Sequence, residues 1–283
     1  MDRRSVLKNL SAASVIPFIP LSATPLMSAS ERKFQHSVCR WCYASYSLEE
    51  LCDIAKDCGI HSIELLNPSE WEVVLNRGLK VALSNGSPLG IQKGWNDPKL
   101  HGQLQKDLLE IIPKAAAMGI PQIIVFSGNR NGLPDDQGIE HCAQGLDPIV
   151  KMAEQYNVRL VMELLNSKIN HPDYQCDRTP WGVKLVDKIG SSHFKLLYDI
   201  YHMQIMEGDV ISTVTDFKDY IAHFHTAGVP GRHEIDQSQE LNYPAIMNAI
   251  VAGGFNGFVA QEFIPAGKDP VQSLRNGINI CSV

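Results

Sequence analysis

Acidic and imidazole side chains recur near the ends of four apolar segments in the second half of the chain. Residues 161–166, 197–202, 223–226 and 260–263 each read as a short strand. Ionisable groups are costly inside such segments unless they are neutralised or coordinated. Four consecutive segments with this pattern predict one shared site, whose candidate members are Glu163, Asp199, His202, His225 and Glu262.

The three carboxylates of Glu163, Asp199 and Glu262 would repel one another at a common rim, and a divalent cation would remove that repulsion. Together with the imidazole of His225 they offer oxygen ligands and one nitrogen ligand. This set suits Mn²⁺, Mg²⁺ or Co²⁺, and Zn²⁺ also accepts it. The sequence therefore predicts a metal site. The alternative is a cluster of carboxylates held only by hydrogen bonds.

A metal with open positions can polarise a carbonyl oxygen and a neighbouring hydroxyl together, which acidifies the C–H between them. Glu163 and Glu262 belong to strands that are not adjacent in the chain order. They could face a small molecule from opposite sides, remove a proton from one carbon and return it at the next through an enediolate. The predicted chemistry is proton transfer in a small hydroxy-carbonyl compound.

Eight β-rich runs alternate with helical stretches and would have to position these groups. Each run is nearly continuous in apolar residues, which indicates a parallel sheet that is buried on both faces. No glycine-rich phosphate motif follows the first run, which argues against a dinucleotide-binding fold. We expect one (β/α)₈ TIM barrel over residues 31–283, with chemistry at the C-terminal strand ends. The predicted strands are 36–43, 62–66, 81–84, 122–127, 159–166, 195–202, 221–226 and 258–263.

The predicted helices begin and end at recognisable signals. Ser47 precedes Glu50 by three residues, as in a capping box, and Asn242 caps a helix with an early proline. Glycines follow several helix ends, where a left-handed residue is favoured. The main predicted helices are 48–58, 104–118, 139–156, 181–189, 210–220 and 243–252.

The net charge of the chain indicates which partners it can bind, and the N-terminal segment indicates where the protein is located. The 283 residues carry a formal charge of -6, which argues against binding along nucleic acid or an anionic membrane. Residues 1–30 join Arg3 and Arg4 to a short apolar run and small residues, as in a twin-arginine export signal. The sequence thus predicts a periplasmic protein without a membrane span. An amphipathic N-terminal helix is the alternative for this segment.

Several ordered motifs resemble the hydroxypyruvate isomerase family of xylose isomerase-like TIM barrels. They include Glu163-Leu164-Leu165-Asn166, Tyr198-Asp199-Ile200-Tyr201-His202, Pro230-Gly231-Arg232-His233-Glu234 and Gln261-Glu262-Phe263. The resemblance implies metal ligation by Glu163, Asp199, His225 and Glu262, with the two glutamates as the proton-transfer pair. It also implies that His202 and Arg232 contact substrate oxygens, and the planar fork of Arg232 suits a carboxylate or phosphate. Asn166 is a third candidate for substrate contact.

Other functions stay open at this point. A sugar 3-epimerase or a dehydratase would use the same metal and the same proton abstraction, and an endonuclease on this fold would need a basic groove. An exported sugar-binding protein would bind without turnover. A homodimer is expected for such a barrel. Four further residues are interpreted more plainly. Cys39 and Cys42 are expected as small buried side chains on a strand, and Trp41 as a core aromatic, with stacking on a substrate as the alternative. His171 lies in the loop after the fifth strand, where it could line the barrel mouth.

Overall fold

The computed structural model describes residues 33–283. The predicted export signal, residues 1–30, lies outside the described residues, so it stays a prediction. Among the described helices, none is both long enough and apolar enough to cross a membrane.

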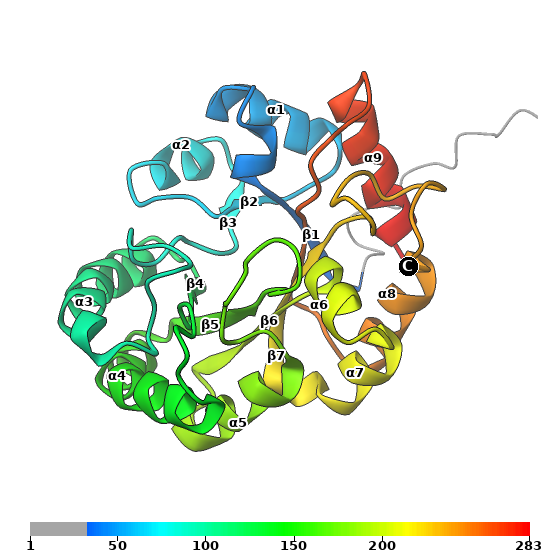
Figure 1. Ribbon diagram of the computed structural model, residues 1–283. Helices are drawn as coiled ribbons and strands as arrows, with labels where there is room; N and C mark the ends of the chain where they lie inside the picture. The colour runs from blue at the N-terminus through cyan, green and yellow to red at the C-terminus, as the bar shows by residue number, and fades with distance from the viewer. Residues whose placement is uncertain (1–32) are drawn as a thin grey trace, which may run out of the picture.

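Eight parallel strands form the centre of the molecule (Figure 1). They are hydrogen-bonded in the order β3-β2-β1-β8-β7-β6-β5-β4. The remaining gap is closed by Ser84, whose backbone bridges Leu66 on one side and Ile123 on the other. The predicted TIM barrel is confirmed. Its strands are β1 Gln35–Cys39, β2 Ser62–Glu64, β3 Lys80–Val81, β4 Gln122–Val125, β5 Arg159–Leu164, β6 Phe194–Asp199, β7 Ile221–Thr226 and β8 Phe258–Gln261.

Helices surround the strands on the outside of the barrel, as Figure 1 shows. The predicted capping box is present, because Ser47 and Glu50 each accept the other's backbone N–H. Three helices, α2, α6 and α9, were not predicted, and the helix predicted over 210–220 is shorter and followed by a 3₁₀ turn. The helices are α1 Leu48–Asp57, α2 Trp71–Asn76, α3 His101–Ala117, α4 Asp135–Tyr156, α5 Thr179–Ile189, α6 Ile200–Met206, α7 Val210–Asp216, α8 Tyr243–Ala252 and α9 Pro270–Cys281.

Every predicted strand except β7 ends earlier than expected, and two of these differences, at β6 and β1, bear on the site. The strand predicted over 195–202 stops at Asp199, and helix α6 begins at Ile200. The reason is local: the Asp199 carboxylate accepts the backbone N–H of His202 at 3.1 Å, which caps the new helix. His202 therefore lies on a helix and not on a strand.

The first strand is also shorter, since β1 stops at Cys39 and a 3₁₀ turn, Arg40–Tyr43, follows. The prediction that Cys39 and Cys42 share a strand is wrong. Arg40 stabilises the turn by donating to the Tyr43 carbonyl at 3.0 Å. Cys39 is buried and Cys42 is half-buried, and both are free thiols.

A small apolar layer fills the barrel directly below the polar strand ends. Val161 and Leu197 precede Glu163 and Asp199 by two residues, so each pair faces the same side of its strand. Burying a side chain of this size contributes about 1.5–3 kcal/mol relative to leaving it exposed. The layer supports the polar groups from beneath and consists of Leu83, Ile124, Val161 and Leu197.

Candidate active site

The structure brings four of the predicted site residues together at the C-terminal ends of β5 to β8. Glu163 lies within β5, Asp199 ends β6, His225 lies in β7 and Glu262 follows β8. All four side chains are buried, and their ligand atoms lie within 4.8 Å of one another. The barrel brings these strand ends together around one axis. This is why side chains as far apart in sequence as Glu163 and Glu262 converge here.

The donor set fits a divalent cation. Ligands of an octahedral ion with bonds of about 2.1 Å are about 3 Å apart when adjacent and about 4.2 Å apart when opposite. The mutual limit of 4.8 Å among the atoms of Glu163, Asp199, His225 and Glu262 is compatible with this spacing. Three carboxylates with one imidazole are also a chemically suitable set for Mn²⁺, Mg²⁺ or Co²⁺.

His225 lies at the centre of this cluster. Its Nδ1 is 3.2 Å from Glu163 Oε1 and 2.9 Å from Glu262 Oε2. Burial lowers the pKa of His225, but the charge of Glu262 and the other neighbours outweigh burial and raise the pKa well above its usual value. Nδ1 of His225 thus faces two carboxylates at once.

Arg232 supplies a second positive charge. Its guanidinium lies 2.6 Å from Glu262 Oε2 and 3.3 Å from Asp199 Oδ2, and it stacks over the Trp41 ring at 5.1 Å from the centroid. Burial raises the pKa values of Asp199 and Glu163, whereas Arg232 and His225 overcome burial and hold the pKa of Glu262 well below its usual range. The positive charges of Arg232 and His225 thus act most strongly on Glu262, whose pKa is lowered, while the pKa values of Asp199 and Glu163 stay raised.

His202 presents an N–H with no hydrogen-bond partner in the described structure. Its Nδ1 receives the backbone N–H of Asn166 at 3.2 Å and the side-chain amide at 2.6 Å, so its proton belongs on Nε2. That buried Nε2 is unpartnered and lies 3.6 Å from Asp199 Oδ2. Burial and then Arg232 lower the pKa of His202, which keeps the ring neutral. The arrangement suits donation to a substrate oxygen.

Asn166, a predicted candidate for substrate contact, has its side chain bonded within the protein. Its side-chain oxygen accepts the backbone N–H groups of Ile169 and Asn170, and its amide donates to Asn170 and to His202. These bonds occupy the side chain within the protein. Asn166 therefore orients the His202 ring, and the structure does not direct it towards a substrate.

Trp41 is not a core residue, and that prediction is wrong. Its side chain is 40% exposed and its indole N–H donates to Glu262 Oε1 at 2.8 Å. The 3₁₀ turn after β1 points the ring over the cluster. The sequence carried a weak signal for this position, namely an aromatic side chain directly after a strand end, but nothing in it named the Glu262 partner.

A cavity of about 360 Å³ lies over the cluster. His171 lines it, as predicted for a residue at the mouth, and its ring centroid is 5.3 Å from that of His202. The segment between β5 and α5 that carries His171 loops over the centre of the barrel (Figure 1). The walls combine apolar and charged groups: Trp41, Leu65, Asn85, Ile91, Ile124, Phe126, Glu163, Leu165, His171, Arg232 and Glu262. The size and lining suit a small polar molecule.

Comparison with known proteins identifies the family to which this fold belongs. Residues 76–280 match the family described as the xylose isomerase-like TIM barrel. The chain belongs to that family. The match covers most of the barrel and includes every strand end that carries a member of the four-residue cluster, and the resemblance expected from the sequence motifs is confirmed.

Two curated relatives of this xylose isomerase-like barrel are named isomerases. A 2-oxo-tetronate isomerase from Pectobacterium atrosepticum is 27% identical, over 76% of this chain and 85% of the relative. A hydroxypyruvate isomerase from Escherichia coli is 26% identical, over 79% of this chain and 90% of the relative. The similarity therefore spans nearly complete proteins.

Solved structures show the same fold at lower identity. A family 2 AP endonuclease from Brucella melitensis superimposes with a TM-score of 0.77 at 22% identity, covering 87% of this chain and 96% of the other. A D-psicose 3-epimerase from Clostridium cellulolyticum H10, solved with D-tagatose, gives a TM-score of 0.69 at 15% identity, covering 86% and 90%. At these identities the likeness concerns the fold alone.

Glu64 is a buried acid that the sequence analysis missed. It ends β2, and its Oε1 lies 2.8 Å from His225 Nε2 and 2.9 Å from His223 Nε2. Burial raises the pKa of Glu64, but His223 and His225 outweigh it through charge and hydrogen bonds and lower the pKa to about 2. The rule that found Glu163 and Glu262, an acid at the end of an apolar strand, would have found Glu64 as well.

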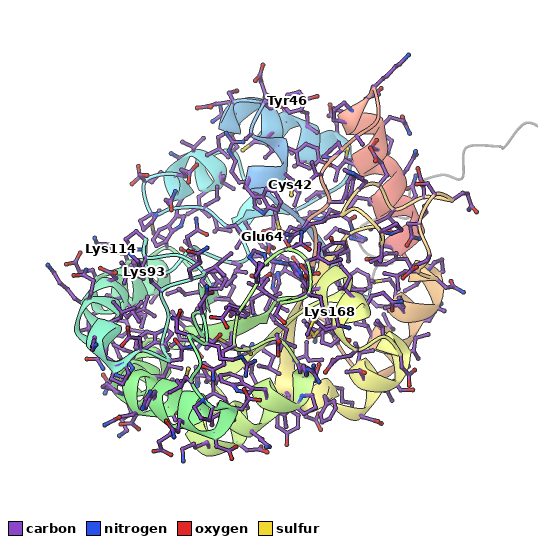
Figure 2. The ribbon with its side chains drawn as sticks, viewed as in Figure 1. Cys42, Tyr46, Glu64, Lys93, Lys114 and Lys168 are labelled. Atoms are coloured by element: carbon purple, nitrogen blue, oxygen red, sulfur yellow. The ribbon has the colours of Figure 1, made fainter. Side chains whose placement is uncertain are left out.

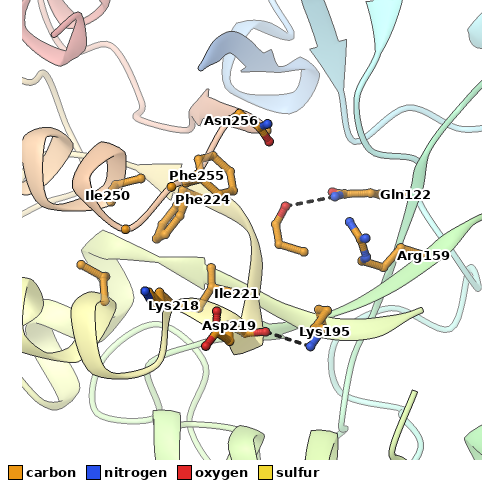
Figure 3. Close-up of a pocket in the computed structure, with 15 residues that line it drawn as sticks. Gln122, Arg159, Lys195, Lys218, Asp219, Ile221, Phe224, Ile250, Phe255 and Asn256 are labelled. Carbon is orange, nitrogen blue, oxygen red and sulfur yellow. Dashed lines mark hydrogen bonds between the residues drawn. The ribbon is translucent and has the colours of Figure 1, made fainter. Parts of the chain in front are cut away.

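A second cavity, of about 330 Å³, lies at the opposite end of the barrel, beside the starts of β4 to β7 (Figure 3). Its cationic side chains are Arg159, Lys195 and Lys218. Lys195 donates to the Asp219 carbonyl at 2.8 Å, and Gln122 donates to the Ala222 carbonyl at 3.0 Å, as Figure 3 shows. Much of this polar lining is thus bonded to the protein's own backbone.

Proposed function

We propose that this protein is a metal-dependent isomerase of the aldose–ketose type, acting on a small hydroxy-carbonyl compound such as hydroxypyruvate or a short sugar. The observation that carries the proposal is the convergence of Glu163, Asp199, His225 and Glu262 beneath a small cavity. The relatives named hydroxypyruvate isomerase and 2-oxo-tetronate isomerase support it, because both names describe movement of a carbonyl in a small hydroxy acid.

Mn²⁺, Mg²⁺ or Co²⁺ would be held by the four clustered side chains, and Zn²⁺ is the further candidate. When bound, such an ion polarises a carbonyl and an adjacent hydroxyl oxygen and so acidifies the C–H between them. The rest of the chemistry belongs to the protein. Arg232 and the indole of Trp41 hold the two oxygens of Glu262 in place, at 2.6 Å and 2.8 Å.

Glu163 and Glu262 form the proton-transfer pair. They belong to the ends of β5 and β8, which β6 and β7 separate in the barrel, so they reach the cavity from different sides. One carboxylate removes a proton from the hydroxyl-bearing carbon; the C–H electrons form the C=C bond of an enediolate, and the carbonyl π electrons move onto the carbonyl oxygen. The other carboxylate delivers a proton to the former carbonyl carbon, which takes up the C=C electrons, while the hydroxyl proton passes to the former carbonyl oxygen and the former hydroxyl oxygen becomes the new carbonyl.

His202 and Arg232 bind the substrate in this proposal. The unpartnered Nε2–H of His202 donates to a substrate oxygen, which Asn166 secures by fixing the tautomer. Arg232 provides a planar cation at the cavity wall and binds a substrate carboxylate. Water is excluded by the ring of Trp41 and the segment around His171, both of which line the cavity.

A 3-epimerase or a dehydratase is the second candidate function. The fold shared with D-psicose 3-epimerase supports it, and the same buried carboxylates would abstract the same type of proton. The isomerase and the epimerase or dehydratase would use the same site and would differ in how the intermediate reacts further.

The test is product analysis in deuterated water. The Mn²⁺-loaded protein is incubated with hydroxypyruvate and with short ketoses, and products are separated and identified by NMR. An isomerase moves the carbonyl and incorporates deuterium at the neighbouring carbon. Inversion at one carbon would establish an epimerase, loss of water a dehydratase, and tight binding without turnover a sugar-binding protein.

A further inference from the structure

Glu64 occupies an unusual position for an acid. It lies at the end of β2, next to β1 and across the barrel from β7, with no solvent exposure. Figure 2 labels it near the middle of the barrel. The proposed proton transfer does not use it, and it is not a member of the four-residue cluster. A buried carboxylate is costly unless its surroundings compensate it, so its contacts indicate its role.

Those contacts are two imidazoles close to Oε1, with the Cys39 thiol donating to the same oxygen at the longer distance of 3.9 Å. His223 and His225 lie two residues apart on β7, so both face the barrel interior, and their Nε2 atoms lie 2.9 and 2.8 Å from Glu64 Oε1. A carboxylate oxygen only accepts hydrogen bonds, whereas an imidazole N–H donates. Glu64 is therefore the acceptor, and both rings donate Nε2–H to it.

The donation fixes the other end of the His225 ring. With its proton on Nε2, the Nδ1 atom points at Glu163 Oε1 and Glu262 Oε2, at 3.2 and 2.9 Å. An imidazole nitrogen binds a metal through its lone pair, and a carboxylate on the opposite nitrogen orients the ring and increases its basicity. The geometry of Glu64 and His225 is that of such a carboxylate–histidine pair.

We infer that Glu64 is a positioning residue for the metal centre: it holds Nε2–H of His225, with His223 as its second anchor, so that Nδ1 serves as the ligand. This inference rests on the proposed function, because it needs a metal in the four-residue cluster. Glu64 itself contacts neither the substrate cavity lining nor the proton-transfer pair within hydrogen-bond distance.

The backbone around Glu64 supports this assignment. Leu65, the next residue, has a φ of +56°, a left-handed conformation that a branched side chain rarely adopts. Such strain persists where surrounding contacts over-determine it, and it concentrates at functional sites. Here the Leu65 N–H donates to the Leu83 carbonyl at 2.9 Å, and the Leu65 side chain lines the cavity. The turn ends β2 at the residue that faces His225.

The test compares metal binding in three proteins by calorimetric titration of the metal-free forms with Mn²⁺. Wild type is expected to bind about one ion per chain. Glu64→Gln keeps the shape but loses the charge and is expected to bind about 10- to 100-fold more weakly. Glu64→Asp keeps the charge at a longer distance and is expected to lie between the two.

His223→Gln is the matched control, because it removes the other imidazole from the same carboxylate and leaves the His225 contact. A purely structural role for Glu64 predicts lower thermal stability for Glu64→Gln and His223→Gln with Mn²⁺ affinity unchanged in both. Wild-type affinity in folded Glu64→Gln would overturn the inference. Absence of Mn²⁺ binding by wild type would instead overturn the proposed function.

A second measurement does not require any variant to fold. In wild-type protein labelled with ¹⁵N-histidine and loaded with diamagnetic Zn²⁺, long-range ¹H–¹⁵N correlations report which nitrogen of His225 carries the proton. The inference expects a proton on Nε2 and the metal on Nδ1. Metal on Nε2, or a His225 ring that remains unligated while Zn²⁺ is bound, would contradict it.

Discussion

The two ends of the barrel hold cavities of similar size and opposite character. The upper cavity, at the C-terminal ends of the strands, has a volume of about 360 Å³, and the lower cavity, at their N-terminal ends, has a volume of about 330 Å³. Both are lined by charged side chains. In the upper cavity Glu262 pairs with Arg232, and Glu163 and Glu262 both lie against Nδ1 of His225. In the lower one Lys195 and Arg159 donate to backbone carbonyls.

This difference distinguishes the proposed active site from the lower cavity. The volumes are similar, and charged side chains line both cavities. What differs is that the upper groups perturb one another: the pKa values of Asp199 and Glu163 are raised and that of Glu262 is lowered. Opposed shifts among neighbouring acids are typical of functional sites, because proton transfer needs groups of different basicity. At the lower cavity, Lys195 and Arg159 instead stabilise the N-terminal ends of the strands through their hydrogen bonds to backbone carbonyls.

Glu262→Gln gives the largest expected effect on the upper end. The substitution preserves the shape of the side chain and removes its charge, and with it a proposed metal ligand and one member of the proposed proton-transfer pair. We expect kcat to fall by about 10³-fold while the fold is retained. Steady-state isomerisation and circular dichroism measure the two quantities. Activity within a few-fold of wild type would remove Glu262 from the mechanism.

Arg232→Lys is expected to have the next largest effect. Lysine keeps the charge but loses the planar fork that contacts Asp199 and Glu262 and stacks on Trp41. We expect KM for a substrate with a carboxylate to rise about 10-fold or more, with a smaller change for an uncharged ketose. Equal changes for both substrates would show that Arg232 positions the protein's own acids and does not recognise the substrate.

Glu234→Gln tests the support of the Arg232 segment and should have a smaller effect. The Glu234 carboxylate accepts the N–H groups of Ala266 and Gly267 and the hydroxyl of Ser273, which joins that segment to the loop after β8. We expect KM to rise about 3-fold and Tm to fall by about 1–2 °C. Kinetics and calorimetry at neutral pH provide the comparison with wild type.

The stabilising effect of Glu234 also depends on pH. Burial raises its pKa, but the hydrogen bonds from Gly267, Ala266 and Ser273 outweigh burial and lower the pKa below 4.5. A carboxyl group with a lowered folded pKa contributes its stability above its unfolded pKa and loses it as pH falls through the folded value. The Tm difference between wild type and Glu234→Gln should therefore be full at pH 7 and shrink below about pH 4.5. A difference that is constant with pH would contradict this account.

Lys195→Gln, at the lower cavity, is expected to have the smallest effect on activity. It removes one hydrogen bond to the Asp219 carbonyl, worth about 1 kcal/mol of stability, and lies far from the strand ends that carry the acids. We expect kcat and KM within about two-fold of wild type. A large loss of activity would show that the two ends of the barrel are not functionally distinct.

The sequence predicted the parts of the site that follow from strand periodicity. Glu163, Asp199 and Glu262 were found because each ends an apolar run, and the barrel follows from eight such runs. It could not predict contacts between distant segments, such as the indole of Trp41 on Glu262, 221 positions away. His202 was placed on a strand because the apolar pattern continues past Asp199, whereas the Asp199 carboxylate starts a helix there.

Asn166 illustrates a second limit. Its type and position were compatible with substrate binding, but four hydrogen bonds of its side chain are directed to Ile169, Asn170 and His202. Which way an amide points depends on the turn that follows the strand, and that turn carries no periodic signal. The twin-arginine signal, the periplasmic location and the homodimer stay predictions.

Elemental analysis tests the central claim most directly. The protein is purified without added metal or chelator, and its metal content is measured beside that of Glu163→Ala and His225→Ala. The account predicts about one ion of Mn, Co, Mg or Zn per chain in wild type and its loss in both variants. Wild-type protein that holds no ion and binds none when Mn²⁺ is added would contradict the account, and the four buried residues would then form a structural cluster.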